Sequence, residues 1–249
     1  MSSRYATYLL PTLATITILI FWELIVHLFS IPAFILPAPS AILGSLGNWG
    51  MVVWQNSLVT LQTTLIGFAI ALFTGLVLGF LIGYSKLVYT TLYPILVGFN
   101  TIPKVAIVPL LAIWFGIGTI PAVMTAFLLA FFTIAVNVSL GLSTVEPEMR
   151  DVLKSLGASQ WEVFQKVGFP HSLPYLFASL KIAISQAFIG SVISETVASD
   201  RGIGYLIVTA TSNFDIALAF LCLLTLAVMG IALYAIFAVV EQRTVHWLR

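Results

Sequence analysis

The chain has 249 residues, of which 60% are hydrophobic and 8% are charged, and its formal net charge is +1. Because soluble domains carry about 25% charged residues, this composition excludes an ordinary soluble protein and indicates a chain that lies in a lipid bilayer. The balanced charge gives no reason to expect a nucleic-acid partner. The single cysteine, Cys222, excludes an intrachain disulfide.

Six apolar segments are long enough to cross a bilayer, which takes about 20 residues. They run over 7–29, 57–83, 88–114, 119–143, 174–198 and 215–240. The first is longer than the ~7–15 apolar residues of a signal peptide, so we expect an uncleaved span. The sequence therefore predicts an all-α membrane protein with about six transmembrane helices in one domain, 1–249.

The stretch 30–56 contains no charged residue. Its three prolines are Pro32, Pro37 and Pro39. They are expected to break any helix there, while Trp49 and Trp54 suit a membrane interface. We expect residues 1–56 to form the first span and an external segment along the bilayer, and residues 57–240 to form a five-span core.

Glu23 and His27 lie four residues apart on one face of the first span. Two ligands do not make a metal site, so the spacing favours a hydrogen-bonded structural pair. We expect no metal site in this chain.

The second span carries small residues at every fourth position. They are Gly67, Ala71, Gly75, Gly79 and Gly83. Such stripes let membrane helices approach closely. We expect helix packing within the chain, with a contact between two copies of the chain as the alternative.

Lys104 is the most unusual residue of the third span. It would lie about sixteen residues into the span, some ~24 Å along a helix axis, and Pro94, Pro103 and Pro109 interrupt the helix around it. An ionisable residue at such depth usually faces a cavity or an interior partner. It is a candidate for the translocation path of an anion, with Asn100 one turn earlier as a helper. The alternative is a lysine that pairs with a carboxylate or snorkels.

Positive charges indicate the orientation of the spans, because cytoplasmic loops are enriched in lysine and arginine. With the N-terminus inside, the cytoplasmic side receives Arg4, Lys86, Arg150, Lys154, Lys166, Arg243 and Arg249. Lys181 can snorkel to the same side, and the outside receives only Arg201. We therefore expect both termini to be cytoplasmic.

The segment between the fourth and fifth spans concentrates charge, since seven of the chain's 19 charged residues lie between Glu146 and Lys166. Its apolar residues recur with helical spacing, Gly157 interrupts them, and Pro170 and Pro174 are expected to end the helix before the fifth span. The pattern predicts a short helix-turn-helix suited to a groove on a soluble partner. The alternative is an amphipathic helix that rests on lipid headgroups.

The same segment resembles the EAA loop of permease subunits of bacterial ABC importers. In that signature E-A-A is followed by three residues, a glycine, nine residues and I-x-L-P. Asp151-Val152-Leu153 stand in the E-A-A place, Gly157 has the expected spacing, and Val167-Gly168-Phe169-Pro170 close the motif. The departures are Asp for Glu and bulkier residues for the two alanines.

Three more segments are similar to the nitrate, sulfonate, taurine and bicarbonate branch of these permeases. They are LPAPSAI (36–42), IPKVAIVPLLAIWFGIG (102–118) and ETVASDRGIGYLI (195–207). The resemblance implies a type I importer fold and a bacterial inner-membrane location. It also implies a second permease copy (a homodimer), two cytoplasmic ATPase subunits and an external solute-binding protein.

The resemblance further implies that residues 148–170 form the coupling loop that docks on the ATPase. Its expected contact residues are Asp151, Leu153, Leu156, Gly157, Ala158, Trp161, Phe164 and Pro170. Leu156 and Trp161 would fill the partner's cleft, and Gly157 would permit the turn. Glu195 is a further candidate along the path, although we favour for it a gate or loop-anchoring role through Arg201.

The chain supplies no ATPase site, because a Walker A loop needs Gly-Lys followed by Ser or Thr and no lysine here follows a glycine. ATP and magnesium are therefore expected on the partner subunits, and the chain is not an enzyme by itself. The expected solute is a small anion such as nitrate, a sulfonate, taurine or bicarbonate, with a thiamine precursor or another small organic molecule as the alternative. An ion-coupled secondary transporter is the competing class, but the two halves of the chain show no repeat of the kind common there.

Overall fold

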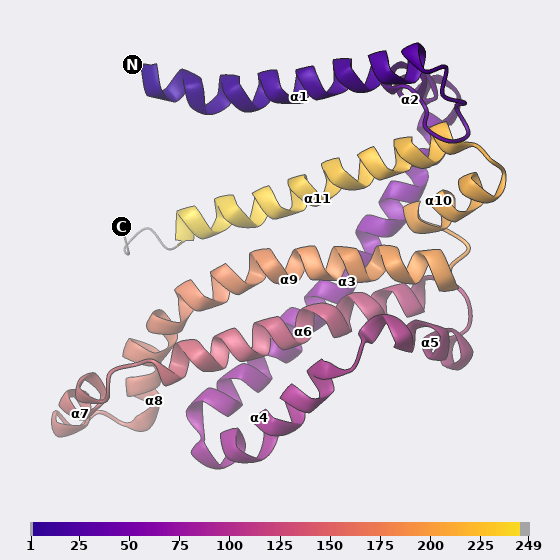
Figure 1. The fold of residues 1–249 in the computed structure, drawn as a ribbon. Coiled ribbons are helices and arrows are strands. Elements are labelled where there is room, and N and C mark those ends of the chain that lie inside the picture. The colour runs from indigo at the N-terminus through magenta and orange to yellow at the C-terminus, as the bar shows by residue number, and fades with distance from the viewer. Residues whose placement is uncertain (1, 245–249) are drawn as a thin grey trace.

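The computed structural model describes the backbone of residues 2–244 and the side chains of residues 9–244 other than Pro147 and Arg150. Arg249, expected on the cytoplasmic side, lies outside the described residues. Within them the chain is helical without strands (Figure 1). The helices are α1 (Ser2–Leu28), α2 (Pro39–Gly44), α3 (Leu46–Tyr84), α4 (Lys86–Thr101), the 3-10 turn η1 (Lys104–Ile107), α5 (Val108–Phe115), α6 (Thr119–Ser143), α7 (Pro147–Ser155), α8 (Gln160–Val163), the π-turn η2 (Phe164–Gly168), α9 (Phe169–Ala198), α10 (Ile203–Ser212) and α11 (Ile216–Thr244).

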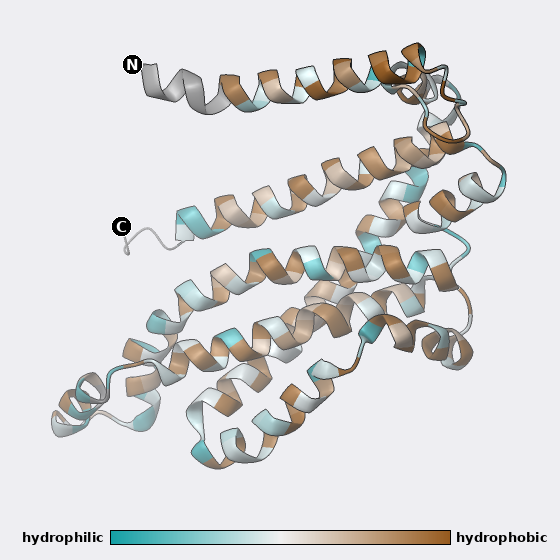
Figure 2. Ribbon diagram, in the orientation of Figure 1, coloured by the Kyte–Doolittle hydropathy of each residue, from teal (hydrophilic) through white to brown (hydrophobic). Residues whose placement is uncertain are grey.

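Five of the described helices are long and apolar enough to cross a membrane, and α4 together with η1 and α5 makes a sixth span if the bent pair is counted as one. This confirms the all-α fold with about six spans. Figure 2 shows the long helices mostly hydrophobic, while hydrophilic residues gather on α7, α8 and the ends of the spans.

The interruption expected within the span 88–114 lies at Pro103, where the chain bends by 78° between α4 and η1. Pro103 has no N–H to donate, and its ring disfavours a helical conformation at the preceding residue. Ile102 is accordingly extended, with φ −68° and ψ 127°. Pro94 stays inside α4, and Pro109 lies in the first turn of α5, where a missing donor is tolerated.

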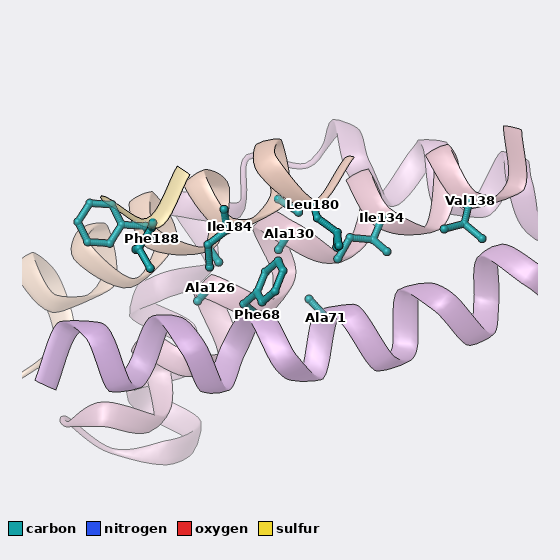
Figure 3. Packing of buried hydrophobic residues seen from close by; sticks show 12 residues of the cluster. Phe68, Ala71, Ala126, Ala130, Ile134, Val138, Leu180, Ile184 and Phe188 are labelled. Carbon is teal, nitrogen blue, oxygen red and sulfur yellow. The ribbon is translucent and has the colours of Figure 1, made fainter. Parts of the chain in front are cut away.

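The core is formed where α3, α6 and α9 pack side by side (Figure 3). Ala126 and Ala130 of α6 are fully buried and small, which lets Phe68 of α3 and Ile184 of α9 approach the same layer. The buried residues of α6 recur every fourth position, as expected for one face of a helix. α11 closes the core through Phe237, whose ring centroid lies 5.0 Å from that of Phe68.

The glycine stripe of α3 faces α6 of the same chain. A Cβ on Gly67 would lie 2.6 Å from the Cβ of Ala126, and one on Gly79 would lie 2.7 Å from the carbonyl oxygen of Ala135. Gly75 and Gly83 would meet Ile134 and Leu142 of the same helix. The stripe is therefore taken up by the contact within the chain, as expected.

The segment 30–56 is more helical than expected. α3 begins at Leu46, eleven residues before the span expected over 57–83, because no proline follows Pro39 until Pro94. Pro39 itself starts α2, where its missing N–H breaks no helical hydrogen bond.

α1 lies at the edge of the bundle, next to α2 (Figure 1). The hydrogen-bonded pair expected in it is confirmed, since His27 Nε2 lies 3.0 Å from Glu23 Oε1. Glu23 also accepts hydrogen bonds from the backbone N–H and the hydroxyl of Ser40, at 3.0 and 2.6 Å. The pair therefore attaches α1 to the start of α2.

The prolines after the charged loop do not end its second helix. α8 continues through η2 into α9, so that Gln160–Ala198 forms one long apolar element. Pro170 lies in the first turn of α9 and Pro174 lies inside that helix. The wider π-turn before them changes the hydrogen-bond register just where two backbone donors are missing, which lets the helix continue.

Candidate functional site

The turn between α7 and α8 is fixed by backbone hydrogen bonds. The N–H of Ala158 donates to the carbonyl of Leu153 at 3.0 Å, and the N–H of Gly157 donates to that of Lys154 at 2.9 Å. This pair of bonds is a Schellman motif, whose penultimate residue needs a left-handed conformation. Gly157 has φ +86°, so the turn needs glycine for its backbone, since nothing lies within 4 Å of an added Cβ.

The start of α8 is fixed by a capping box. The hydroxyl of Ser159 accepts from the N–H of Glu162 at 3.3 Å, and the carboxylate of Glu162 accepts from the N–H of Ser159 at 2.8 Å. The sequence pattern Ser-x-x-Glu, an available signal for this feature, was not among those used above. The turn is thus closed on both sides and presents α7 and α8 in a defined geometry.

The residues expected to contact an ATPase differ in their exposure to solvent. Those exposed are Asp151, Leu156, Gly157 and Trp161, and those half-buried are Leu153, Ala158, Phe164 and Pro170. Leu156 and Trp161 are 78% and 62% exposed, which is unusual for large apolar side chains outside lipid or an interface.

Phe164 faces the membrane helices and not the open side. Its ring lies edge-on to Phe80 and Tyr84 of α3, with centroid distances of 5.6 and 6.3 Å, and it stacks on Trp161 at 5.2 Å. Val163 beside it is buried. The segment 148–170 is therefore attached to the end of α3 by one aromatic cluster.

Lys104 lies at the bend of the third span, in η1. Its Nζ donates to the carbonyl oxygen of Asn100 at 2.8 Å and also to the side-chain oxygen of Asn100. Both residues are half-buried, and no carboxylate of the described residues lies within ion-pair distance of Lys104. Asn100 is thus the hydrogen-bond partner of Lys104, whereas the carboxylate pair given as an alternative is not formed among the described residues. η1 packs against both α6 and α9.

Three polar residues in the middle of α6 and α9 were missed in the sequence. Thr133 donates to the side-chain oxygen of Gln186 at 2.5 Å, and Asn137 donates to the carbonyl of Thr133 at 2.8 Å. All three are half-buried. Amide side chains inside apolar spans are a signal of helix contacts or of a solute path. The sequence offers this signal at Asn137 and Gln186, but the charge of Lys104 is the stronger one.

Glu195 is buried, with 1% of its surface exposed. Its carboxylate accepts from the hydroxyl of Thr60 at 2.8 Å and from the N–H of Gly204 at 3.0 Å, with Thr63 and Ser191 at 3.4 Å. The expected connection through Arg201 is wrong, because Arg201 is exposed and its nearest carboxylate is Asp200, at 3.7 Å. Glu195 instead holds the first turn of α10.

The loop before α10 fits closely over this carboxylate. Gly202 has φ +98°, and a Cβ on it would lie 2.3 Å from the carboxyl carbon of Glu195. Its N–H donates to the side chain of Asn56 at 2.8 Å, and the N–H of Ile203 donates to Thr60 at 2.9 Å. Side chains of α3 and α9 therefore supply the cap that α10 lacks in its own sequence. Asn56 and Thr60 were missed because nothing local connects residues some 140 positions apart.

Lys181, expected to snorkel, forms an ion pair. Its Nζ lies 2.5 Å from the carboxylate of Glu241, and both side chains are partly buried. The pair joins α9 to the end of α11.

The chain is similar to known proteins over most of its length. Residues 71–246 match the family described as the binding-protein-dependent transport system inner membrane component. The riboflavin transport system permease protein of Chloroflexus aurantiacus is 34% identical over 92% of this chain and 87% of its own length. The formylaminopyrimidine transport permease of Halalkalibacterium halodurans is 28% identical over 95% of each chain. The taurine transport system permease of Escherichia coli is 29% identical over 95% of this chain and 85% of its own.

The fold has a counterpart among solved structures. A chain of the MetNI methionine ABC transporter in an inward-facing conformation superposes with a TM-score of 0.69, at 18% identity, over 79% of this chain and 97% of that one. An amino acid ABC transporter superposes with a TM-score of 0.64. With the family match over most of its length, the chain belongs to the inner membrane components of binding-protein-dependent transport systems, which are the permease subunits of ABC importers.

Proposed function

We propose that this permease couples ATP hydrolysis on separate cytoplasmic subunits to the import of a small solute through residues 148–170. The supporting observation is the turn between α7 and α8, which is closed by a Schellman motif and a capping box while it leaves Leu156 and Trp161 exposed. A rigid support with exposed apolar side chains suits the centre of an interface, where such residues commonly dominate the binding energy.

The same geometry offers a path for mechanical coupling. α8 is continuous with α9 through η2, so a displacement of the loop is carried along an element that reaches Glu195 and the cap of α10 at the other end. Phe164 carries the displacement to α3 as well, through Phe80 and Tyr84. Two copies of the chain would rock in this way around a shared path in the bacterial inner membrane.

The path is proposed to include Lys104 and Asn100. A half-buried ammonium group without a carboxylate partner favours a small anion. A second candidate is an uncharged organic solute, favoured by the half-buried amides of Asn137 and Gln186. Relatives of both kinds exist, one named for taurine and others for riboflavin and formylaminopyrimidine.

The decisive experiment reconstitutes the permease with its ATPase and its solute-binding protein in proteoliposomes. We expect uptake that requires ATP and the binding protein. Uptake that follows an imposed proton or sodium gradient without ATP would replace the proposal with a secondary transporter. The ligand that copurifies with the binding protein, identified by mass spectrometry, decides between the two solute classes.

A further inference from the structure

Two adjoining hollows lie where the end of α3 meets the coupling loop. The first, of about 250 Å³, is lined by Gly83 and Leu142 of the membrane helices and by Lys154 and Gln160 of the loop, among others. The second, of about 380 Å³, is lined by Val77, Phe80, Leu81, Tyr84, Trp161 and Phe164. Because Tyr84 and Phe164 line both, the two hollows adjoin, and together they are called the groove, with the first as its polar end and the second as its apolar end.

The apolar end belongs to the bilayer. Val77 to Tyr84 is the last part of a spanning helix and covers ~10 Å at 1.5 Å per residue. Val77 and Leu81 are exposed on the side of α3 away from the glycine stripe, so lipid chains are their surroundings. Tyr84, which lines both hollows, is a residue type that favours the level of the headgroups.

The polar end carries positive charge. Lys154 and Gln160 line it, and Lys86 follows directly after α3. Lys154 has no carboxylate within ion-pair distance among the described residues. The ammonium group of Lys154 and the amide donor of Gln160 suit a lipid phosphate, and the apolar end next to them suits an acyl chain of the same lipid.

We propose that this groove binds an anionic glycerophospholipid, with its phosphate at Lys154 and Gln160 and an acyl chain along Val77, Phe80 and Leu81. The proposal rests on the proposed function in one respect, namely that the loop lies on the cytoplasmic side of the membrane. A lipid in this position would contact α3 and α8 together and so would hold the coupling loop in its docking pose. Transport would then depend on the anionic lipid content of the membrane.

The test is native mass spectrometry of the full-length permease, purified in mild detergent doped with phosphatidylglycerol or with phosphatidylcholine of the same chains. We expect wild-type protein to retain phosphatidylglycerol in preference. Lys154→Gln should weaken this retention about fivefold, which corresponds to ~1 kcal/mol for one basic residue near an anionic headgroup. Lys166→Gln removes the same charge from the same loop but away from the groove, and should leave retention unchanged.

A second pair of variants tests the apolar end. Leu81→Trp fills the groove and should reduce the retention of both lipids, whereas Leu65→Trp, at an equally apolar exposed position earlier in α3, should not. Equal retention by all four variants overturns the proposal. So does disulfide crosslinking between copies through Cys at position 81, which would make the groove a contact between permeases.

ATPase copurification with the same variants separates this proposal from the coupling function. Wild-type protein that retains the lipid but never captures its ATPase refutes the coupling loop alone. Lipid retention equal in the Lys154→Gln and Lys166→Gln variants, together with normal ATPase capture, refutes the lipid site alone.

Discussion

Gly157 and Trp161 have different tasks in the same loop. Gly157 sets the direction of the chain through a positive φ that a β-branched residue adopts only under strain. Trp161 offers exposed apolar area on the helix that follows, supported from behind by Phe164. We therefore expect Gly157 to position the loop and Trp161 to contact the ATPase.

Gly157→Val should abolish ATPase docking, because the Schellman turn loses its left-handed residue and α8 changes direction. Gly157→Asn is the matched control, since asparagine tolerates this conformation, and it should keep most of the docking. Copurification of a tagged ATPase with the membrane-inserted permease measures both. Equal capture by the two variants would show that the turn has no part in docking.

Trp161→Ala should weaken ATPase binding about thirtyfold, since the loss of a central aromatic anchor can cost ~2 kcal/mol. Trp54→Ala serves as its control, because Trp54 is 61% exposed but lies near the other end of α3. A titration of the ATPase onto nanodisc-embedded permease gives the two dissociation constants. If the helix rests on lipid instead, both variants bind like the wild type.

Lys104→Met should lower solute uptake while ATPase docking stays intact, because it removes the charge at the bend without touching the loop. Lys104→Arg should retain part of the uptake, since the charge remains although the donor geometry differs. Transport assays with the purified complex measure both. Normal uptake by the Met variant would remove Lys104 from the path and leave the polar residues of α6 and α9 as candidates.

At the scale of elements, α10 depends on groups that other helices supply. Glu195→Leu would leave the N–H of Gly204 without its acceptor in a buried place, while the hydroxyl of Thr60 could still donate to the carbonyl of Asn56 at 3.2 Å. Each buried unpaired group costs ~1–3 kcal/mol, so thermal unfolding in detergent should begin at a clearly lower temperature. Glu195→Gln keeps an acceptor oxygen and should lose much less. Equal melting of the two variants would contradict the capping role.

The stability of the fold also depends on the close contact between α3 and α6. Gly79→Ala would place a methyl group 2.7 Å from the carbonyl oxygen of Ala135, and backbone atoms cannot yield as a flexible side chain would. We expect a loss of ~1–3 kcal/mol, as for an overpacked core. Gly98→Ala, in α4 with nothing within 4 Å, should be neutral or slightly stabilising. Thermal unfolding of the two variants, measured side by side, shows whether the first loses stability while the second keeps or gains it.

The elements show how far the sequence alone can be taken. Hydropathy located the spans because every turn of a lipid-facing helix repeats the same signal, and the glycine spacing indicated a close helix contact. An interruption of the third span by its prolines was expected, and Pro103 produces it as a 78° bend. The uninterrupted passage from α8 to α9 was not foreseen, because the effect of Pro170 and Pro174 depends on whether neighbouring groups replace the lost hydrogen bonds. Glu195 was expected to act through Arg201 because charge suggested that partner, while the fold brought Thr60 and Gly204 to its carboxylate.

At the scale of the whole molecule, α3 extends from one end of the permease to the other. Its 39 residues span ~58 Å at 1.5 Å per residue, which exceeds the ~30 Å of hydrocarbon. Asn48 lies in its first turn, and Ser159 lies in the loop that packs on its last turn through Phe164 (Figure 1). The two residues are exposed and should therefore lie on opposite sides of the membrane.

Single cysteines at these two positions test that arrangement, in a background in which the buried Cys222 is replaced by alanine. A cysteine at position 48 should react with a membrane-impermeant maleimide added to intact cells after the outer membrane is permeabilised. A cysteine at position 159 should react only after the inner membrane is opened, because the positive charges of the loop keep it in the cytoplasm. Reaction of both from outside would reverse the placement of the coupling loop, and with it the side from which an ATPase could reach Leu156 and Trp161.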